Sequence, residues 1–260
     1  MKIHAAYNVF DNEELLEDSI RSIREFVDEV TIIYQKVSNF GQPCDPHLED
    51  LLRHLRDDRL VDTLVSYNVQ NVSPDINERK KNNIGYEFAK KSKSDYHMVM
   101  NCDEFYFKEG FLEIVELLKK YPVDVVTSYM YTYYKSSKYR FKEIENYSVA
   151  VMNKVCEGRE YIQMAPNPLL LDPSRRMSYD SCFCFPKTTP HMHHLSHVRK
   201  DFSKKLLNST ARAHDPQFET YIPKMVECYQ NWRPVEDAFL FGKYVELERT
   251  DAFDKEIKFD

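Results

Sequence analysis

The sequence DYHMVMNCDEFYF at residues 95–107 is an apolar segment that ends in two adjacent acids. Its run at 96–100 is typical of a buried strand, and it stops abruptly at Asn101, Cys102, Asp103 and Glu104. An unpaired carboxylate at the end of a buried strand is energetically costly. Either the two acids therefore reach solvent in a turn, or a positively charged group lies on them.

Strands and helices alternate along the chain before this segment. The predicted strands are 2–9, 29–35, 59–67 and 96–100, and the predicted helices are one around 16–27 and those at 46–56 and 75–91. Such alternation implies βαβ units, and hence an open α/β sheet with parallel strands, flanked by helices. Ligands bind such sheets at the carboxyl ends of the strands, which is where Asp103 and Glu104 emerge.

The pattern changes after a predicted helix at 111–121. Residues 123–141 form a long, aromatic, β-prone run, 147–155 and 181–185 are shorter predicted strands, and helical periodicity returns at 202–207 and 235–245. No linker rich in Gly, Ser or Pro separates the halves. We therefore expect the later half to continue the same sheet, as a mixed sheet in a single domain.

Composition excludes several classes of protein. A net charge of -6 argues against general nucleic-acid binding. The chain has neither GxGxxG nor a P-loop motif, and no apolar run approaches the roughly 18 residues of a transmembrane segment. The six cysteines show no CxxC spacing, which favours free thiols in a reducing compartment.

Two groups of side chains are candidate metal ligands. Asp103 and Glu104 can hold Mn²⁺ or Mg²⁺, which prefer carboxylate oxygens, although Asp103 capping the next helix is the simpler alternative. HMHHLSHVRKD at 191–201 contains four of the nine histidines, and strand geometry places His193 and His194 on opposite faces. One imidazole from this cluster can join Asp103 on a single metal, and Arg199 can meet phosphate oxygens. A hydrogen-bonded surface strand is the alternative.

The segment NERKKNNIG at 77–85 begins a basic helix just before the acidic strand. Usually such a helix start is a solvated face. Here Arg79 and Asn83 can lean over the same crevice, where an arginine and an amide suit a diphosphate.

These segments together resemble GT-A fold glycosyltransferases of the family-2-like type. NERKKNNIGYEFAKKSKSDYHMVMNCDEFY at 77–106 looks like the segment leading into their DxD motif, AAYNVFDNEELLEDSIRSIREFVDEVTIIYQ at 5–35 resembles their first βαβ unit, and HMHHLSHVRKD resembles the region of their late metal-binding histidine. The resemblance implies a Rossmann-like GT-A domain over 1–260, with a nucleotide-sugar-binding half at 1–107 and an acceptor-binding half at 108–260.

The resemblance also implies roles for the nucleotide-side residues. Asn101 stands where the family usually has the first Asp of DxD, so Asp103 would be the carboxylate that binds the metal. Asn101 would offer a neutral oxygen or a hydrogen bond to ribose. His193 or His194 would complete the metal shell. Tyr7 and Asn8, after the first strand, would lie near the nucleotide base.

The implied reaction is metal-assisted glycosyl transfer from a nucleotide diphosphate sugar to a glycan or other hydroxyl acceptor. An inverting enzyme needs a carboxylate base, and the family order favours Asp180, with Asp237 in reserve. A cytoplasmic enzyme is expected. Two alternatives remain: a metal-dependent hydrolase using the histidine cluster, and a noncatalytic module that binds a nucleotide or glycan.

Overall fold

The computed structural model describes residues 1–11, 13–163, 171–234 and 236–259. Its helices are α1 (Glu13–Ile23), α2 (Leu48–Asp57), α3 (Pro74–Lys91), α4 (Lys108–Lys120), α5 (Phe202–Asn208) and α6 (Phe218–Asn231), with 3-10 helices η1 (Pro173–Arg175) and η2 (Thr210–Ala213). Its strands are β1 (Ile3–Val9), β2 (Glu29–Tyr34), β3 (Thr63–Ser66), β4 (Tyr96–Asn101), β5 (Glu104–Tyr106), β6 (Val125–Ser128), β7 (Met130–Tyr134), β8 (Ser136–Phe141), β9 (Val149–Lys154), β10 (Cys182–Cys184), β11 (Met192–His197), β12 (Ala238–Leu240), β13 (Lys243–Val245) and β14 (Leu247–Arg249).

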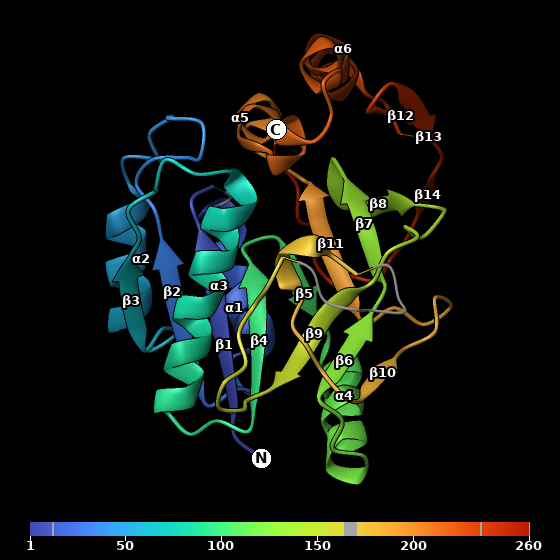
Figure 1. The fold of residues 1–260 in the computed structure, drawn as a ribbon. Helices are drawn as coiled ribbons and strands as arrows, with labels where there is room; N and C mark the ends of the chain where they lie inside the picture. Colours follow the sequence, from blue (N-terminus) through green and yellow to red (C-terminus); the bar gives the residue numbers. More distant parts are fainter. Residues whose placement is uncertain (12, 164–170, 235, 260) are drawn as a thin grey trace.

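A seven-stranded sheet in the order β10-β6-β9-β4-β1-β2-β3 forms the centre of the molecule (Figure 1). The strands β4, β1, β2 and β3 are parallel, whereas β9 runs antiparallel between β4 and β6. The prediction of an open mixed α/β sheet with flanking helices is therefore confirmed. Each of the four predicted strands in the first half overlaps an observed strand, because their β-branched, apolar runs suit burial on both faces.

Helix α3 covers one face of this sheet, and α1, α2 and α4 pack on the other. Gly85 allows α3 to lie close to β1, since an added Cβ would stand 2.5 Å from Cβ of Ala6. The parallel strands run toward α5 and the segment after it (Figure 1). This arrangement places the carboxyl ends of β1, β2 and β4 beneath residues of the C-terminal part.

A second sheet, in the order β14-β8-β7-β11-β5, corrects the expected organisation of the later half. Only β6, β9 and β10 continue the first sheet. The aromatic run at 123–141 breaks at Tyr129, where the chain passes from β6 in the first sheet to β7 in the second, and again at Lys135, whose φ of 65° makes the β7–β8 turn. Hydrophobicity alone does not show which sheet a β-prone segment joins.

The C-terminal helix prediction is wrong for the described residues 236–245. They form the antiparallel hairpin of β12 and β13, with positive φ at Phe241 and Gly242 in the turn. The helix in this region is α6 instead, whose periodicity is obscured by Pro223 within it. All six cysteines are free, as their spacing predicts. Among the described helices, none combines the length and apolar character of a membrane span.

Candidate nucleotide-sugar site

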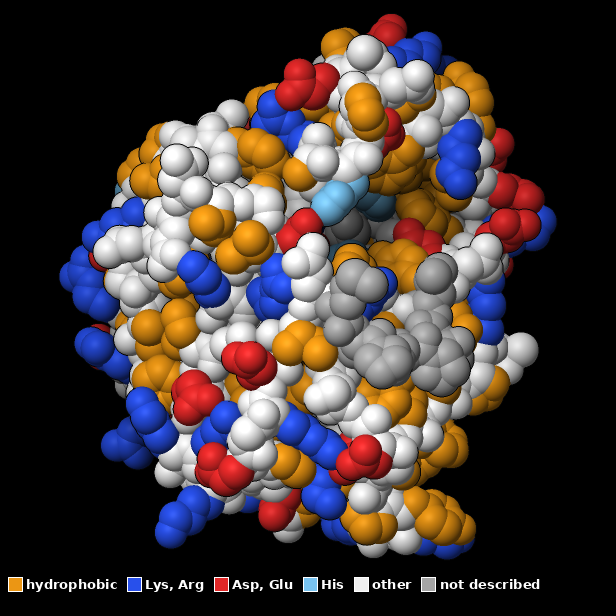
Figure 2. Space-filling view, viewed as in Figure 1, with side chains coloured by type: hydrophobic (Ala, Val, Ile, Leu, Met, Phe, Trp, Pro, Cys, Tyr) orange, Lys and Arg blue, Asp and Glu red, His pale blue; other side chains and the backbone are white. Residues whose placement is uncertain are grey.

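A cavity of about 640 Å³ lies at the carboxyl ends of β1, β2 and β4. Residues of α3 and η1 line its sides, and residues of α5 and η2 cover it. The cover is held across the opening by hydrogen bonds from Asn208 to Gln42 (3.1 Å) and between His214 and Asp75 (3.1 Å). Figure 2 shows the surface hollowed beneath the uppermost part of the molecule, with histidine side chains in the hollow.

Asp103 lies in the turn between β4 of the first sheet and β5 of the second. It is 2% exposed, and its carboxylate is in ion pairs with Arg199, with His194 (Nε2 to Oδ2, 3.4 Å) and with Lys205 (3.9 Å). Burial by itself would raise the pKa of Asp103, but the Arg199 guanidinium, supported by His194 and Lys205, holds this pKa well below its usual value. The carboxylate is therefore charged.

Glu104 is also buried and has its own arginine. Arg175 of η1 forms an ion pair with Oε1 of Glu104, and Asn101 donates to the same carboxylate from its backbone N (3.2 Å) and from Nδ2 (2.9 Å). Burial would lower the pKa of Arg175, and the charge of Glu104 raises it above its ordinary value. Asn101 thus orients a neighbouring acid through its amide, a role that an Asp at that position would not fill.

The adjacent acids are therefore neither solvated nor unpaired, which answers the question raised by the sequence. Each is matched by an arginine that lies 71 or 96 residues later in the chain. Among the described residues, Nη1 of Arg175 and Nη1 of Arg199 are buried without a hydrogen-bond partner. Arg175, Arg199 and Lys205 thus balance the charges of Asp103 and Glu104, and Asp11 and Asp172 also line the cavity.

Asp103, Glu104 and His194 could hold a metal ion, because one ligand atom from each lies within 4.8 Å of the others. Two bonds of about 2.1–2.3 Å to one ion span roughly 4.5 Å, so the donors need only small shifts to share an ion. Two carboxylates and an imidazole are suitable for Mn²⁺ or Mg²⁺. The residues present therefore fit such an ion.

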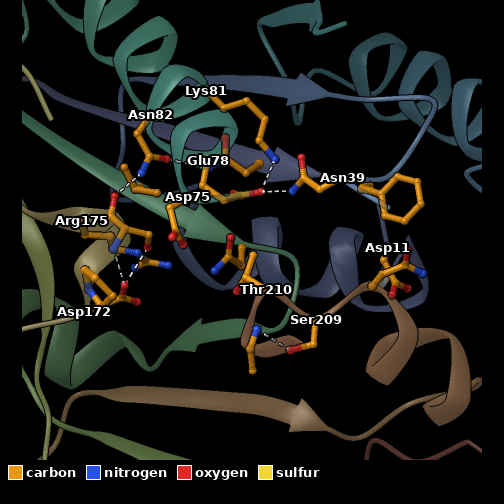
Figure 3. A pocket seen from close by; sticks show the side chains of 18 of the residues that line it. Asp11, Asn39, Asp75, Glu78, Lys81, Asn82, Asp172, Arg175, Ser209 and Thr210 are labelled. Carbon is orange, nitrogen blue, oxygen red and sulfur yellow. Dashed lines mark hydrogen bonds and ion pairs between the residues drawn. The ribbon is translucent and has the colours of Figure 1, made fainter. Parts of the chain in front are cut away.

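On the α3 side of the cavity, Asn82 connects two elements. It accepts from Nδ2 of Asn8 (2.6 Å) and donates to the backbone oxygen of Ser174 (2.7 Å). Figure 3 shows Asn82 beside Arg175, with Lys81, Glu78 and Asn39 further along the same wall.

The two residues of α3 that the sequence singled out do not line this cavity. Asn83 instead holds the backbone of Tyr161, donating to its oxygen (3.2 Å) and accepting from its nitrogen (2.6 Å). Arg79 is half-buried on α3. The residues of α3 that line the cavity are instead Glu78, Lys81 and Asn82, one or two positions from those that the sequence suggested.

The other expected residues lie in several places. Tyr7 is in the core, with its hydroxyl 3.2 Å from Oγ of Ser19. His193 points away from His194, and its Nδ1 lies 2.7 Å from the hydroxyl of Tyr133, with burial lowering its pKa to about 3. Asp180 is exposed beside Arg159, at the amino edge of the first sheet, opposite the cavity. Asp237 lies in a shallow groove near β12.

Several cavity residues were missed by sequence reasoning, among them Arg175 and Asp172. Arg175 and Asp172 stand in LDPSRRM at 171–177, a stretch of sequence without periodicity or a familiar motif. The signal available was the sequence Asp-Pro-Ser, which is typical of a capped turn, and Asp172 does accept from the backbone N (2.8 Å) and Oγ (2.7 Å) of Ser174. Lys205 belongs to a basic run whose pairing only the fold reveals.

Solved structures similar to this chain include several that contain nucleotides. Residues 1–349 of S. aureus TarS with UDP-GlcNAc match at 12% identity over 52% of this chain and 35% of that one, with a TM-score of 0.36. S. aureus TarS also matches at 9% identity over 79% and 38%, with a TM-score of 0.48. Glucosyl-3-phosphoglycerate synthase from Mycobacterium tuberculosis, with Mn²⁺, UDP and phosphoglyceric acid, matches at 14% over 50% and 43%, with a TM-score of 0.34.

These solved structures are similar to this chain at identities of 9–14%. In these three alignments the chain spans less than half the length of each matched structure. No protein-family model and no curated protein matches the sequence. Because the TM-scores are below 0.5, the assignment of function rests on the residues of the cavity.

Proposed function

We propose that the protein is a glycosyltransferase that moves a sugar from a nucleotide diphosphate donor to a glycan or other hydroxyl acceptor. The observation that carries the proposal is the meeting of Asp103 and His194, which are 3.4 Å apart at the carboxyl edge of the sheet, inside a cavity large enough for such a donor. Parallel α/β sheets bind ligands at this edge.

The leaving nucleoside diphosphate must be stabilised as negative charge develops on it. Arg175 and Lys205 line the cavity and supply positive charge beside Asp103. Mn²⁺ or Mg²⁺ would be held by Asp103 and His194, with Glu104 as a third donor, and when bound would add neutralising charge at the diphosphate. Asn8 and Asn82, which are hydrogen-bonded to each other, offer amide groups to the ribose.

An inverting enzyme needs a carboxylate base within hydrogen-bond reach of the acceptor hydroxyl. Asp172 lines the cavity and is the N-cap residue of η1. In the sequence it lies between Asp103 and His194, which is where the GT-A family has this base. Asp180 satisfies the same order but lies at the opposite edge of the sheet. We therefore assign the base to Asp172.

The proposal is tested by incubating the protein with nucleotide diphosphate sugars and a mixture of glycan acceptors, with and without Mn²⁺, and detecting transferred sugar by mass spectrometry. We expect transfer or slow donor hydrolysis that depends on Mn²⁺ or Mg²⁺. Asp172→Asn should lower kcat by about 100-fold or more while leaving donor binding intact, because it removes the base and keeps the shape of the side chain.

A matched variant is Asp180→Asn, which removes a carboxylate of the same type outside the cavity. If this variant loses activity and Asp172→Asn does not, the base is Asp180. Absence of donor binding, measured as no rise in melting temperature with any nucleotide diphosphate sugar, contradicts the proposed function as a whole.

A further inference from the structure

The cavity has two chemically different ends. At one end, His194 and Lys205 contact Asp103 and Arg175 contacts Glu104, which suits an anionic group. Gln35 and Asn39, which follow β2, line the other end. Figure 3 shows Arg175 and Asn39 on opposite sides of the view, with the α3 wall between them.

The orientation of the Gln35 amide follows from its hydrogen bond. Gln35 is 2% exposed, and its Nε2 donates to the backbone oxygen of Val37 (3.1 Å). A carbonyl oxygen only accepts, so the nitrogen must lie on that side and Oε1 on the other. In the described part of the chain, Oε1 of Gln35 is buried without any hydrogen-bond donor. A buried acceptor left in this state is unfavourable until a ligand supplies a donor.

Asn39 is oriented by the same logic. Its Nδ2 donates to Oε1 of Glu78 (3.4 Å), a carboxylate that also accepts from Nζ of Lys81 (2.7 Å). A carboxylate oxygen only accepts, so Oδ1 of Asn39 is the free end of the amide. Oδ1 is buried and has no donor within the ranges that the structure describes. Gln35 and Asn39, which both line this end of the cavity, thus each carry an amide oxygen that lacks a donor in the described residues.

We infer that this end recognises guanine, so that the donor is a guanine nucleotide; the inference rests on the proposed function. Guanine presents two adjacent N–H donors, at N1 and at the exocyclic N2. Uracil presents a single N–H between two carbonyl oxygens, which would face the amide oxygens unfavourably. Adenine and cytosine place a ring-nitrogen acceptor beside their amino group, so one of the two amide oxygens would meet an acceptor.

The position of the two ends is consistent with a nucleotide. Asp103 follows β4, Asn8 is in β1 and Gln35 follows β2, and these three strands are neighbours in that order. Two strand spacings are about 10 Å, which matches the reach from a diphosphate across a ribose to a base. The amides of Asn8 and Asn82 lie between the two ends and so face the ribose.

The test measures binding of GDP, IDP, UDP, ADP and CDP to the whole chain by isothermal titration calorimetry, with Mg²⁺ present throughout. We expect GDP to bind at least about tenfold more tightly than the other four, since each missing or opposed hydrogen bond costs about a factor of ten. IDP differs from GDP only in lacking the N2 amino group, so this comparison needs no protein variant.

Variants assign the effect to the two amides. Gln35→Met and Asn39→Leu each keep approximate volume and remove an acceptor, and each should reduce GDP binding about tenfold while changing UDP binding less. Gln70→Met is the matched control, because the amide oxygen of Gln70 already accepts from Lys80, and it should leave all affinities unchanged. Melting temperatures of the variants show whether they are folded.

Tighter binding of UDP, ADP or CDP than of GDP overturns the guanine inference but leaves the proposed function standing. Equal binding of GDP and IDP also overturns the inference, because the N2 donor would then be unused. If none of the five nucleotides binds, both the guanine inference and the proposed function fail.

Discussion

Arginines bind carboxylates at both edges of the seven-stranded sheet, and the two arrangements differ in their burial. At the carboxyl edge, Arg199 pairs with Asp103, and the two side chains are 1% and 3% exposed. At the amino edge, Arg159 bridges Asp124 (3.0 Å) and Asp180 (3.1 Å), and the side chain of Asp180 is 95% exposed. The chemical groups are the same, but the Arg159–Asp180 pair is in contact with solvent and the Arg199–Asp103 pair is not.

This difference in burial indicates which of the two edges of the sheet can bind a ligand. A carboxylate at the amino edge is satisfied by its surroundings, because Asp124 also accepts from the backbone N of Asp180 (2.9 Å) and of Ser181 (3.3 Å). At the carboxyl edge, each of Arg175 and Arg199 keeps one buried nitrogen without a partner in the described residues. Burial without full hydrogen bonding is unfavourable for stability, and such sites tend to be functional.

Removing an arginine from each edge should show the largest contrast. Arg199→Met leaves Asp103 as a buried charge that has lost its strongest partner, so we expect a loss of about 3–5 kcal/mol in the free energy of unfolding. Arg159→Met should cost about 1 kcal/mol or less, because its pairs are partly solvated and backbone amides still hold Asp124. Urea denaturation of both variants measures this. Equal losses would remove the distinction between the edges.

The pH dependence of stability tests burial inside the same sheet. His4 of β1 is buried, with Nδ1 3.0 Å from Nδ1 of His97 and Nε2 3.0 Å from Oγ1 of Thr31, and burial lowers its pKa from 6.5 to about 4. The unfolded chain then binds more protons at His4 between these values, so His4 by itself should lower the free energy of unfolding by about 3 kcal/mol as the pH drops from 6.5 to 4.

His4→Leu should reduce this pH dependence, and His54→Gln, at an exposed position on α2, should leave it unchanged. Urea midpoints measured at intervals from pH 7 to 4 give the comparison. A slope that is the same in His4→Leu as in the parent protein would show that His4 is not held neutral in the folded state.

Two neighbouring histidines of β11 offer a third contrast, in activity. His194 faces Asp103, whereas His193 faces the core and binds Tyr133. His194→Asn should lower kcat/KM by about 100-fold, because it removes a group from the charge-stabilising site. His193→Asn should change kcat/KM per folded molecule by less than about fivefold. A larger loss in His193→Asn than in His194→Asn would contradict the position assigned to the site.

The smallest expected effect belongs to Asp180. Its side chain lies in solvent and contributes one partly screened ion pair, so Asp180→Asn should change the free energy of unfolding by less than about 0.5 kcal/mol. Thermal and urea unfolding measure this directly. A loss above about 2 kcal/mol would mean that the amino edge depends on this ion pair as strongly as the carboxyl edge depends on its own.

The first half of the fold was predictable because β1, β2 and β4 are buried on both faces and α1 and α2 each have one apolar stripe. The later half was less so. The run at 123–141 was predicted as one strand and is three, in two sheets, because a single residue, Tyr129, redirects the chain between them. The predicted C-terminal helix is a hairpin, since two residues with positive φ form a turn there.

The amino-acid sequence alone determined the alternating elements of the first half, and with them the emergence of Asp103 and Glu104 at a ligand-binding edge. Local periodicity and strand propensity suffice for that, because they act between residues close in the chain. Only the tertiary structure decided that Arg175, Arg199 and Lys205 meet those acids, and that the histidine beside Asp103 is His194 and not His193. A buried charge needs an opposite charge close to it in space, because the low dielectric of the interior makes an unpaired charge costly. The separation of two residues along the chain does not predict which of them will form such a pair.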